Sequence, residues 1–174
     1  RFLGAHDSGR VLNRLTYDNQ VFGGMAMGIG LGVTEERVLD RQTGKIQWQK
    51  VLKEELPHER THSDGSWASC SPVTAGKHVY AFFGSQGLYC LDLKGNLVWS
   101  KDFGKMTIKM QFGEGASPAL HGETLVVNWD HEGDSFVVAL DKRTGKERWR
   151  VPRDEPTSWV TPLVIEDDGK PLVL

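Results

Sequence analysis

One short segment of the sequence matches a zinc-binding pattern. His58, Glu59 and His62 follow the order His-Glu-x-x-His, which on a helix places both imidazoles on one face for zinc and Glu59 beside a metal-bound water. Pro57 directly precedes the pattern, and Arg60 puts a charge where the buried helix of a metalloprotease needs an apolar residue. We therefore expect a solvated loop, with a metalloprotease as the alternative.

A second segment alternates acidic residues. Asp130, Glu132 and Asp134 offer carboxylate oxygens at every second position, as a calcium-binding loop does. Ser135 stands where an EF-hand loop requires glycine, and strand-like residues follow it. We expect a polar hairpin loop here, with calcium binding as the alternative. No Gly-x-Ser-x-Gly elbow occurs in the chain, so no catalytic residue and no metal site is assigned.

Composition excludes several classes of protein. The chain has 174 residues, with 21 basic and 23 acidic side chains and a net charge of -2. Basic residues do not cluster, which argues against nucleic acid or an anionic membrane surface as the main partner. The most apolar stretch, residues 21–33, is too short to span a bilayer and contains five glycines, so we expect no transmembrane segment.

The elements that position these segments follow from a repeat. Three stretches, 39–48, 91–99 and 140–149, each carry an aspartate, a glycine and a tryptophan in the same order. The tryptophans are 51 and 50 residues apart. A Ser-Pro or Thr-Pro pair also recurs, at 71–72, 117–118 and 161–162. The repeated residues are Asp40, Gly44 and Trp48, then Asp92, Gly95 and Trp99, then Asp141, Gly145 and Trp149.

The residues between these landmarks predict short strands. Runs of β-branched and aromatic residues lie at 78–83 and 124–129, bounded by glycine or polar residues. Asp-x-x-Thr-Gly-Lys predicts a hairpin turn, because the aspartate accepts bonds from the turn backbone and glycine adopts the left-handed conformation. Each unit of about 45 to 50 residues then holds four antiparallel strands, as a propeller blade does. We predict an all-β fold, a β-propeller of about three to four blades, with a β-sandwich as the alternative.

The motif also resembles a known family. Residues 138–149 read Val-Ala-Leu-Asp-Lys-Arg-Thr-Gly-Lys-Glu-Arg-Trp, and are similar to the Ala-x-Asp-x-x-Thr-Gly-Lys-x-x-Trp motif of pyrroloquinoline-quinone (PQQ) repeat propellers. The copy at 92–99 lacks one residue and the threonine, and Val38 replaces the alanine of the first copy. The resemblance covers about residues 33–174 and implies that each tryptophan packs between adjacent blades.

The resemblance divides the chain into two parts. Residues 1–32 do not fit the repeat and are predicted to be irregular or a partial first blade, whereas 33–174 form the PQQ-like repeats. Closed propellers have roughly 4 to 8 blades, so we interpret the chain as part of a larger propeller.

Two functions follow from the resemblance. A non-catalytic scaffold or protein-interaction module is favoured, because the repeat is strong and no catalytic set accompanies it. The alternative is part of a quinoprotein dehydrogenase, in which PQQ with calcium oxidises an alcohol or sugar. Cys70 and Cys90 are the only cysteines, so the adjacent pair of many alcohol-oxidising members is absent.

The favoured function sets the remaining expectations. We expect no cofactor in this segment, and protein partners on the end of the propeller where the loops between blades lie. The resemblance implies a periplasmic or otherwise extracytoplasmic location.

Overall fold

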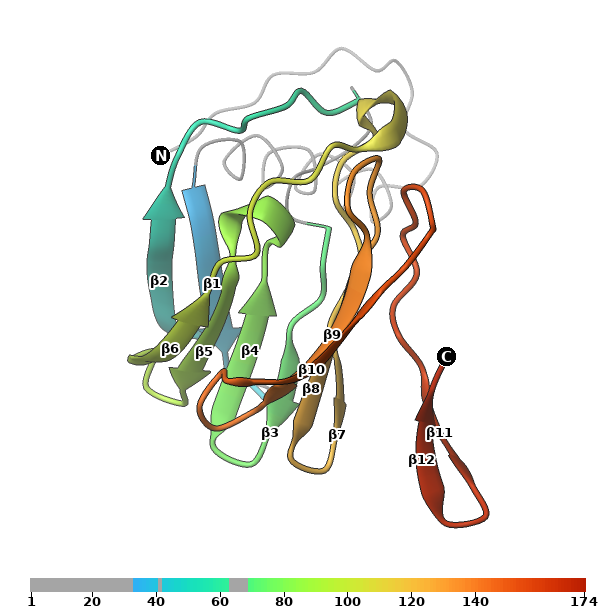
Figure 1. The fold of residues 1–174 in the computed structure, drawn as a ribbon. Helices are drawn as coiled ribbons and strands as arrows, with labels where there is room; N and C mark the ends of the chain where they lie inside the picture. Colours follow the sequence, from blue (N-terminus) through green and yellow to red (C-terminus); the bar gives the residue numbers. More distant parts are fainter. Residues whose placement is uncertain (1–32, 41, 63–68) are drawn as a thin grey trace, which may run out of the picture.

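The computed structural model describes residues 33–40, 42–62 and 69–174 (Figure 1). These residues form twelve short strands and two single-turn 3-10 helices. Within the described ranges no helix has the length and apolar character needed to cross a membrane. The strands are β1 (Val33–Leu39), β2 (Ile46–Glu54), β3 (Val73–Ala75), β4 (His78–Phe82), β5 (Leu88–Asp92), β6 (Leu97–Lys101), β7 (Ala119–His121), β8 (Thr124–Trp129), β9 (Phe136–Asp141), β10 (Glu147–Pro152), β11 (Val164–Asp167) and β12 (Lys170–Val173), and the 3-10 helices are η1 (Gly84–Gln86) and η2 (Lys109–Gln111).

The strands form two complete blades and two half-blades. Each complete blade is a four-stranded antiparallel sheet in chain order, β3-β4-β5-β6 and β7-β8-β9-β10. We use the term half-blades for the two-stranded sheets β1-β2 and β11-β12. The predicted all-β fold with four-stranded antiparallel blades is confirmed. The half-blades lie at opposite ends of the row of sheets (Figure 1).

Hydroxyl groups at the Ser-Pro and Thr-Pro landmarks join successive units. Ser71 donates its backbone N–H to Ser117 Oγ at 2.8 Å, and Ser117 donates its own to Thr161 Oγ1 at 3.2 Å. The same bond thus links the segment before β3 to the segment before β7, and the segment before β7 to the segment before β11. β11-β12 therefore occupies the place of the first two strands of the next unit.

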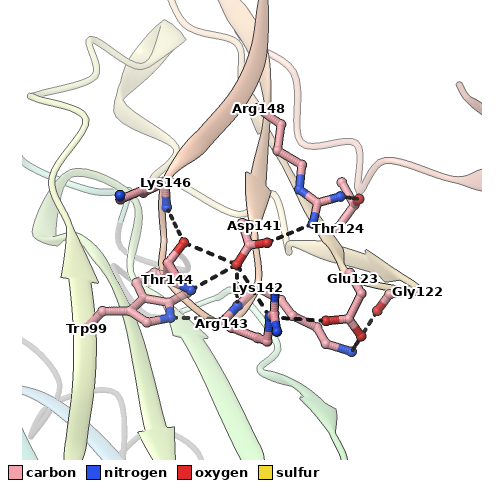
Figure 2. A network of polar contacts seen from close by, with 10 residues as sticks. All are labelled: Trp99, Gly122, Glu123, Thr124, Asp141, Lys142, Arg143, Thr144, Lys146 and Arg148. Carbon is pink, nitrogen blue, oxygen red and sulfur yellow. Dashed lines mark hydrogen bonds and ion pairs between the residues drawn. The ribbon is translucent and has the colours of Figure 1, made fainter.

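The aspartate at each repeat turn organises the turn backbone. Asp141 Oδ1 accepts from the backbone N–H of Arg143 and from both the N–H and the hydroxyl of Thr144 (Figure 2). The Arg148 guanidinium, 2.8 Å from Asp141 Oδ2, and the Thr144 hydroxyl hold the pKa of Asp141 down at about 2. In the copy that lacks threonine, Asn96 Nδ2 donates to Asp92 Oδ2 at 2.8 Å. An amide thus replaces the hydroxyl in the shorter turn.

A tryptophan of one unit contacts the repeat turn of the next. Trp48 Nε1 donates to Leu93 O at 2.8 Å, and Trp99 Nε1 donates to Lys142 O at 3.0 Å. Ring atoms of Trp99 lie 2.7 Å from the position that a Cβ would take on Gly145, and those of Trp48 lie 3.0 Å from the same position on Gly95. Glycine is therefore required both for the positive φ of the turn and for the approach of the indole.

Trp149 differs from the other two repeat tryptophans. Its side chain is 39% exposed, so it is not enclosed between two blades. The expectation that each repeat tryptophan packs between blades stays a prediction at this position, because the unit that follows β10 contributes only β11 and β12 to the described structure.

The core lies between the two complete blades. Alternate residues of β4 and β5 point to one face of their sheet, where Tyr80 and Leu88 meet Leu125 and Val138 of the next blade. The opposite face carries Ala81, Phe83 and Tyr89, which pack against Leu52 of β2. The sheets therefore stack face to face, as blades do.

The contact between Trp99 and Gly145 predicts the effect of a methyl group. Gly145→Ala should lower the free energy of unfolding by about 1–2 kcal/mol through the left-handed backbone, and by a further 1–3 kcal/mol through overlap with the indole. Gly122→Ala is the matched control, since Gly122 has φ +55° and no atom of the described residues near its Cβ position. Denaturant unfolding measures both, and equal losses would contradict the role of the indole.

Candidate functional site

The loops between strands two and three of each blade, and those between blades, gather at one end of the sheets (Figure 1). The described segments are 55–62, 69–72, 83–87, 102–118, 130–135 and 153–163. We call this end the loop face. It is where the predicted candidate residues lie.

The His58–His62 segment lies on the loop face and is not helical. A His58 ring nitrogen lies 2.6 Å from Met106 O, so it donates to that carbonyl, and Glu59 Oε2 accepts from Ile108 N at 3.0 Å. His62 donates its backbone N–H to Gln111 O and meets the Phe112 ring at 5.3 Å. These bonds connect one inter-blade loop to the next. The segment is a loop in the structure, as expected.

The side chains of Asp130, Glu132 and Asp134 point in different directions. Asp130 has a fully buried side chain, and its carboxylate accepts from Arg153 at 2.9 and 3.3 Å, from Ser158 Oγ at 2.8 Å and from Asn128 Nδ2 at 3.1 Å. Glu132 points elsewhere and accepts from Thr157 N at 3.1 Å.

Asp134 is exposed at the tip of the same loop. The spacing therefore does not bring the three carboxylates to one point. Among the described residues, no group of three or more histidine, cysteine, aspartate or glutamate side chains is placed to hold a metal ion.

A buried acid that no motif marked lies beneath the loops. Glu114 receives the backbone N–H and the hydroxyl of Ser85, both at 2.5 Å, and Ser85 Oγ in turn accepts from Met106 N at 2.7 Å. A Cβ on Gly84 would overlap this carboxylate, so glycine is needed there. Burial raises the pKa of Glu114 although the bonds from Ser85 act to lower it. Only its position between two glycines, 113 and 115, distinguishes it in the sequence.

A small cavity lies between Glu114 and Asp130. Asn128, Ser158 and Cys70 also line it, and its volume of about 10 Å³ leaves room for about one water molecule. Burial, followed by the nearby Glu114 carboxylate, raises the pKa of the Cys70 thiol to about 12. The thiol is therefore protonated at neutral pH and is a poor nucleophile.

Exposed apolar side chains gather on the loop face. Met110 is 73% exposed, Trp159 44% and Phe112 42%. The rings of Phe112 and Trp159 lie 6.2 Å apart, and Trp159 Nε1 donates to Gly113 O at 2.8 Å. Met110 and Gln111 both have left-handed backbones, with φ of 53° and 57°. We call Met110, Phe112 and Trp159 the loop-face patch. None of these residues stands at a repeat position, so the repeat does not predict them.

Part of the chain is similar to a molybdenum enzyme. Residues 1–59 match the family described as molybdopterin cofactor-binding domain. The xanthine dehydrogenase molybdenum-binding subunit of Escherichia coli O157:H7 is 42% identical over 57 residues, which are 33% of this chain and 8% of that protein. Residues 33–59 also belong to a second family match, over residues 33–168. In the structure they include β1 and β2, whose Trp48 bonds to the first complete blade.

Solved structures share the propeller fold. BamB from Moraxella catarrhalis superposes with a TM-score of 0.56 at 20% identity, over 79% of this chain and 39% of that one. Quinohemoprotein alcohol dehydrogenase from Comamonas testosteroni gives a TM-score of 0.50 at 19% identity, over 70% of this chain and 18% of that one. The chain therefore spans well under half the length of these relatives.

The longer of the two family matches covers most of the chain. Residues 33–168 match the family described as outer membrane protein assembly factor BamB. This stretch includes all three repeat turns and both complete blades. The chain therefore belongs to the BamB family, and its described residues form part of a PQQ-like β-propeller.

Proposed function

We propose that this chain is a non-catalytic propeller scaffold that binds a protein partner through its loop face. The observation that carries the proposal is that the polar side chains of the loop face bond to other residues of the same loops. Asp130 binds Arg153, Glu114 binds Ser85, and His58 binds the Met106 carbonyl. Groups engaged in this way fix loops to one another and do not converge on a reacting atom.

The small cavity between Asp130 and Glu114 does not fit PQQ. The cavity beside Asp130 and Glu114 has room for about one water molecule, which is far less than a tricyclic quinone needs. The Asp130 carboxylate already accepts from the side chains of Arg153, Ser158 and Asn128, so it is engaged in bonds within the protein. We therefore propose no cofactor for these blades.

The loop-face patch is the proposed contact surface. Methionine and aromatic residues are enriched in protein interfaces, and a few such anchors carry most of the binding energy. Phe112 and Trp159 come from different inter-blade loops and are held together by the bond from Trp159 Nε1 to Gly113 O. The left-handed backbone at Met110 is strained for a residue with a side chain, and such strain is concentrated at functional sites.

The family match supports an extracytoplasmic location and a role in protein assembly. Its description, outer membrane protein assembly factor, is that of a protein that takes part in assembling other proteins at an envelope. We propose an extracytoplasmic location and a role in protein assembly for this chain. We further propose that residues 33–174 form the interaction module and that residues 1–32 lie outside its repeats.

A photo-crosslinking residue tests the contact surface. Placed at Met110 in the producing cell, it should give a crosslink to a protein of one defined mass. The same residue at exposed Lys94, in a repeat turn at the end opposite the loop face, is the control and should give none. Equal crosslinking at both positions would contradict the proposal, as would a stoichiometric mass shift of the protein on adding PQQ with calcium.

The structural role of Glu114 predicts a pH dependence. Its folded-state pKa is raised by burial, so its contribution to stability is complete below the unfolded glutamate pKa of about 4.3 and is lost as pH rises through the folded value. The unfolding free energy of the wild type relative to Glu114→Gln should therefore fall as pH rises from about 4 through the raised pKa of Glu114.

Glu123→Gln provides a control with the opposite sign. The Lys142 ammonium holds the pKa of Glu123 below its usual range, so its contribution is present above that range and lost as pH falls. Denaturant melts across the pH series measure both variants. A difference between wild type and Glu114→Gln that does not change with pH would show that Glu114 is not an enclosed structural acid.

A further inference from the structure

Four side chains of the described residues contain sulfur. They are Cys70, Cys90, Met106 and Met110. Cysteine and methionine are both oxidised at sulfur, and their susceptibility follows exposure and, for cysteine, the fraction of thiolate. The sequence has two further methionines, Met25 and Met27, which lie outside the described residues. The structure therefore allows the four described sulfur atoms to be compared as targets of an oxidant.

Both cysteine thiols are protected from oxidation. Cys90 on β5 is 0% exposed and belongs to the core between the two complete blades. Burial raises the pKa of Cys90 to about 11 and that of Cys70 to about 12. Both thiols are therefore protonated at neutral pH, whereas the thiolate is the form that reacts with an oxidant.

The two methionines have opposite environments although they are four residues apart. Met106 is 4% exposed and packs in the core, and its backbone N–H and carbonyl are bonded to Ser85 and His58. Met110 is 73% exposed. An oxidant in solvent reaches Met110 directly, but it reaches the Met106 sulfur only when the core opens locally.

The backbone on both sides of Met110 is bonded to other loops. Lys109 donates its backbone N–H to Thr157 Oγ1 at 3.0 Å, and Gln111 O accepts from the His62 N–H at 2.7 Å. Thr157 and His62 belong to two different inter-blade loops. The exposed thioether is therefore carried by a segment that is fixed to its neighbours.

We propose that Met110 is an oxidation site: a hydroperoxide oxidises its thioether ahead of the other described sulfur atoms, and the sulfoxide weakens the binding of a protein at the loop-face patch. The second half of this proposal rests on the proposed function. The sulfur lone pair attacks one peroxide oxygen, so that an S–O bond forms and the O–O bond breaks. Sulfur loses two electrons, and the other oxygen leaves with the proton as an alcohol or water. The sulfoxide is polar, so an apolar contact is lost.

Hydrogen peroxide and peptide mass spectrometry test the site itself. The folded protein is treated at neutral pH, and the gain of one oxygen atom at each sulfur is followed with time. Met110 should be oxidised at least about 10-fold faster than Met106, because the Met106 sulfur is enclosed. In denaturant the two should react at similar rates, which is the internal control. Equal rates in the folded protein, or faster oxidation of Cys70 or Cys90, would overturn the site.

Photo-crosslinking from exposed Lys109, beside the patch, tests the effect on binding. Peroxide treatment of the producing cell should lower the crosslink at least about fivefold, as loss of a contributing contact does. In Met110→Leu, which has no thioether to oxidise, the crosslink should be the same before and after treatment. Met106→Leu is the matched control and should respond to peroxide as the wild type does, and Met110→Gln should lower the crosslink without peroxide.

Two kinds of failure can be told apart. A wild type that gives no crosslink before treatment would overturn the proposed function and with it the effect on binding, whereas the oxidation rates would still decide the site. A crosslink that persists when Met110 is fully oxidised, or one that falls equally in Met110→Leu, would overturn the effect on binding while leaving the proposed function in place.

Discussion

The contact of an indole with a glycine turn is the interaction on which the arrangement of the blades depends. A four-stranded sheet of this kind has two apolar faces and needs a neighbour on each. Trp48 and Trp99 set the position of each neighbour, because the indole combines ring contact with a hydrogen bond to a backbone carbonyl. Glycine meets two requirements of this contact. It adopts the left-handed backbone that closes the turn, and because it has no Cβ the indole ring can pack against it.

Fixed blades in turn bring distant loops together at one end. Bonds across the loop face join residues 24 to 49 positions apart, such as Thr107 with His131 and Ile108 with Glu59. These bonds use the polar groups that a catalytic site would need, and they leave the loop-face patch exposed on a supported backbone. An exposed apolar surface beside paired polar groups supports the proposed role in binding a protein.

The blades could be predicted from the sequence because their signals are local and periodic. The aspartate, glycine and tryptophan of each repeat act within a turn or at a spacing of about 50 residues, and a period of this length is diagnostic. The substitution of Asn96 for the missing threonine could not be predicted, because it depends on the shape of the shortened turn.

The side-chain positions on the loop face could be predicted less well than the blades. Spacing along the sequence determines which side chains lie together only within a helix or strand. His58 and His62 would share a face on a helix, but the segment is a loop and each residue contacts a different partner. Asp130 and Glu132 are two residues apart and yet point to different loops. Glu114 and the loop-face patch were missed because their partners lie on other loops, with no periodic signal to connect them.

The central claim, that indole contacts hold successive blades together, is tested most directly by hydrogen exchange of the tryptophan indole N–H groups followed by NMR. The indole protons of Trp48 and Trp99 should exchange slowly, because each is bonded to a carbonyl of the next unit and opens only when the blades separate. Exchange of both protons at the rate of a free indole would contradict the account.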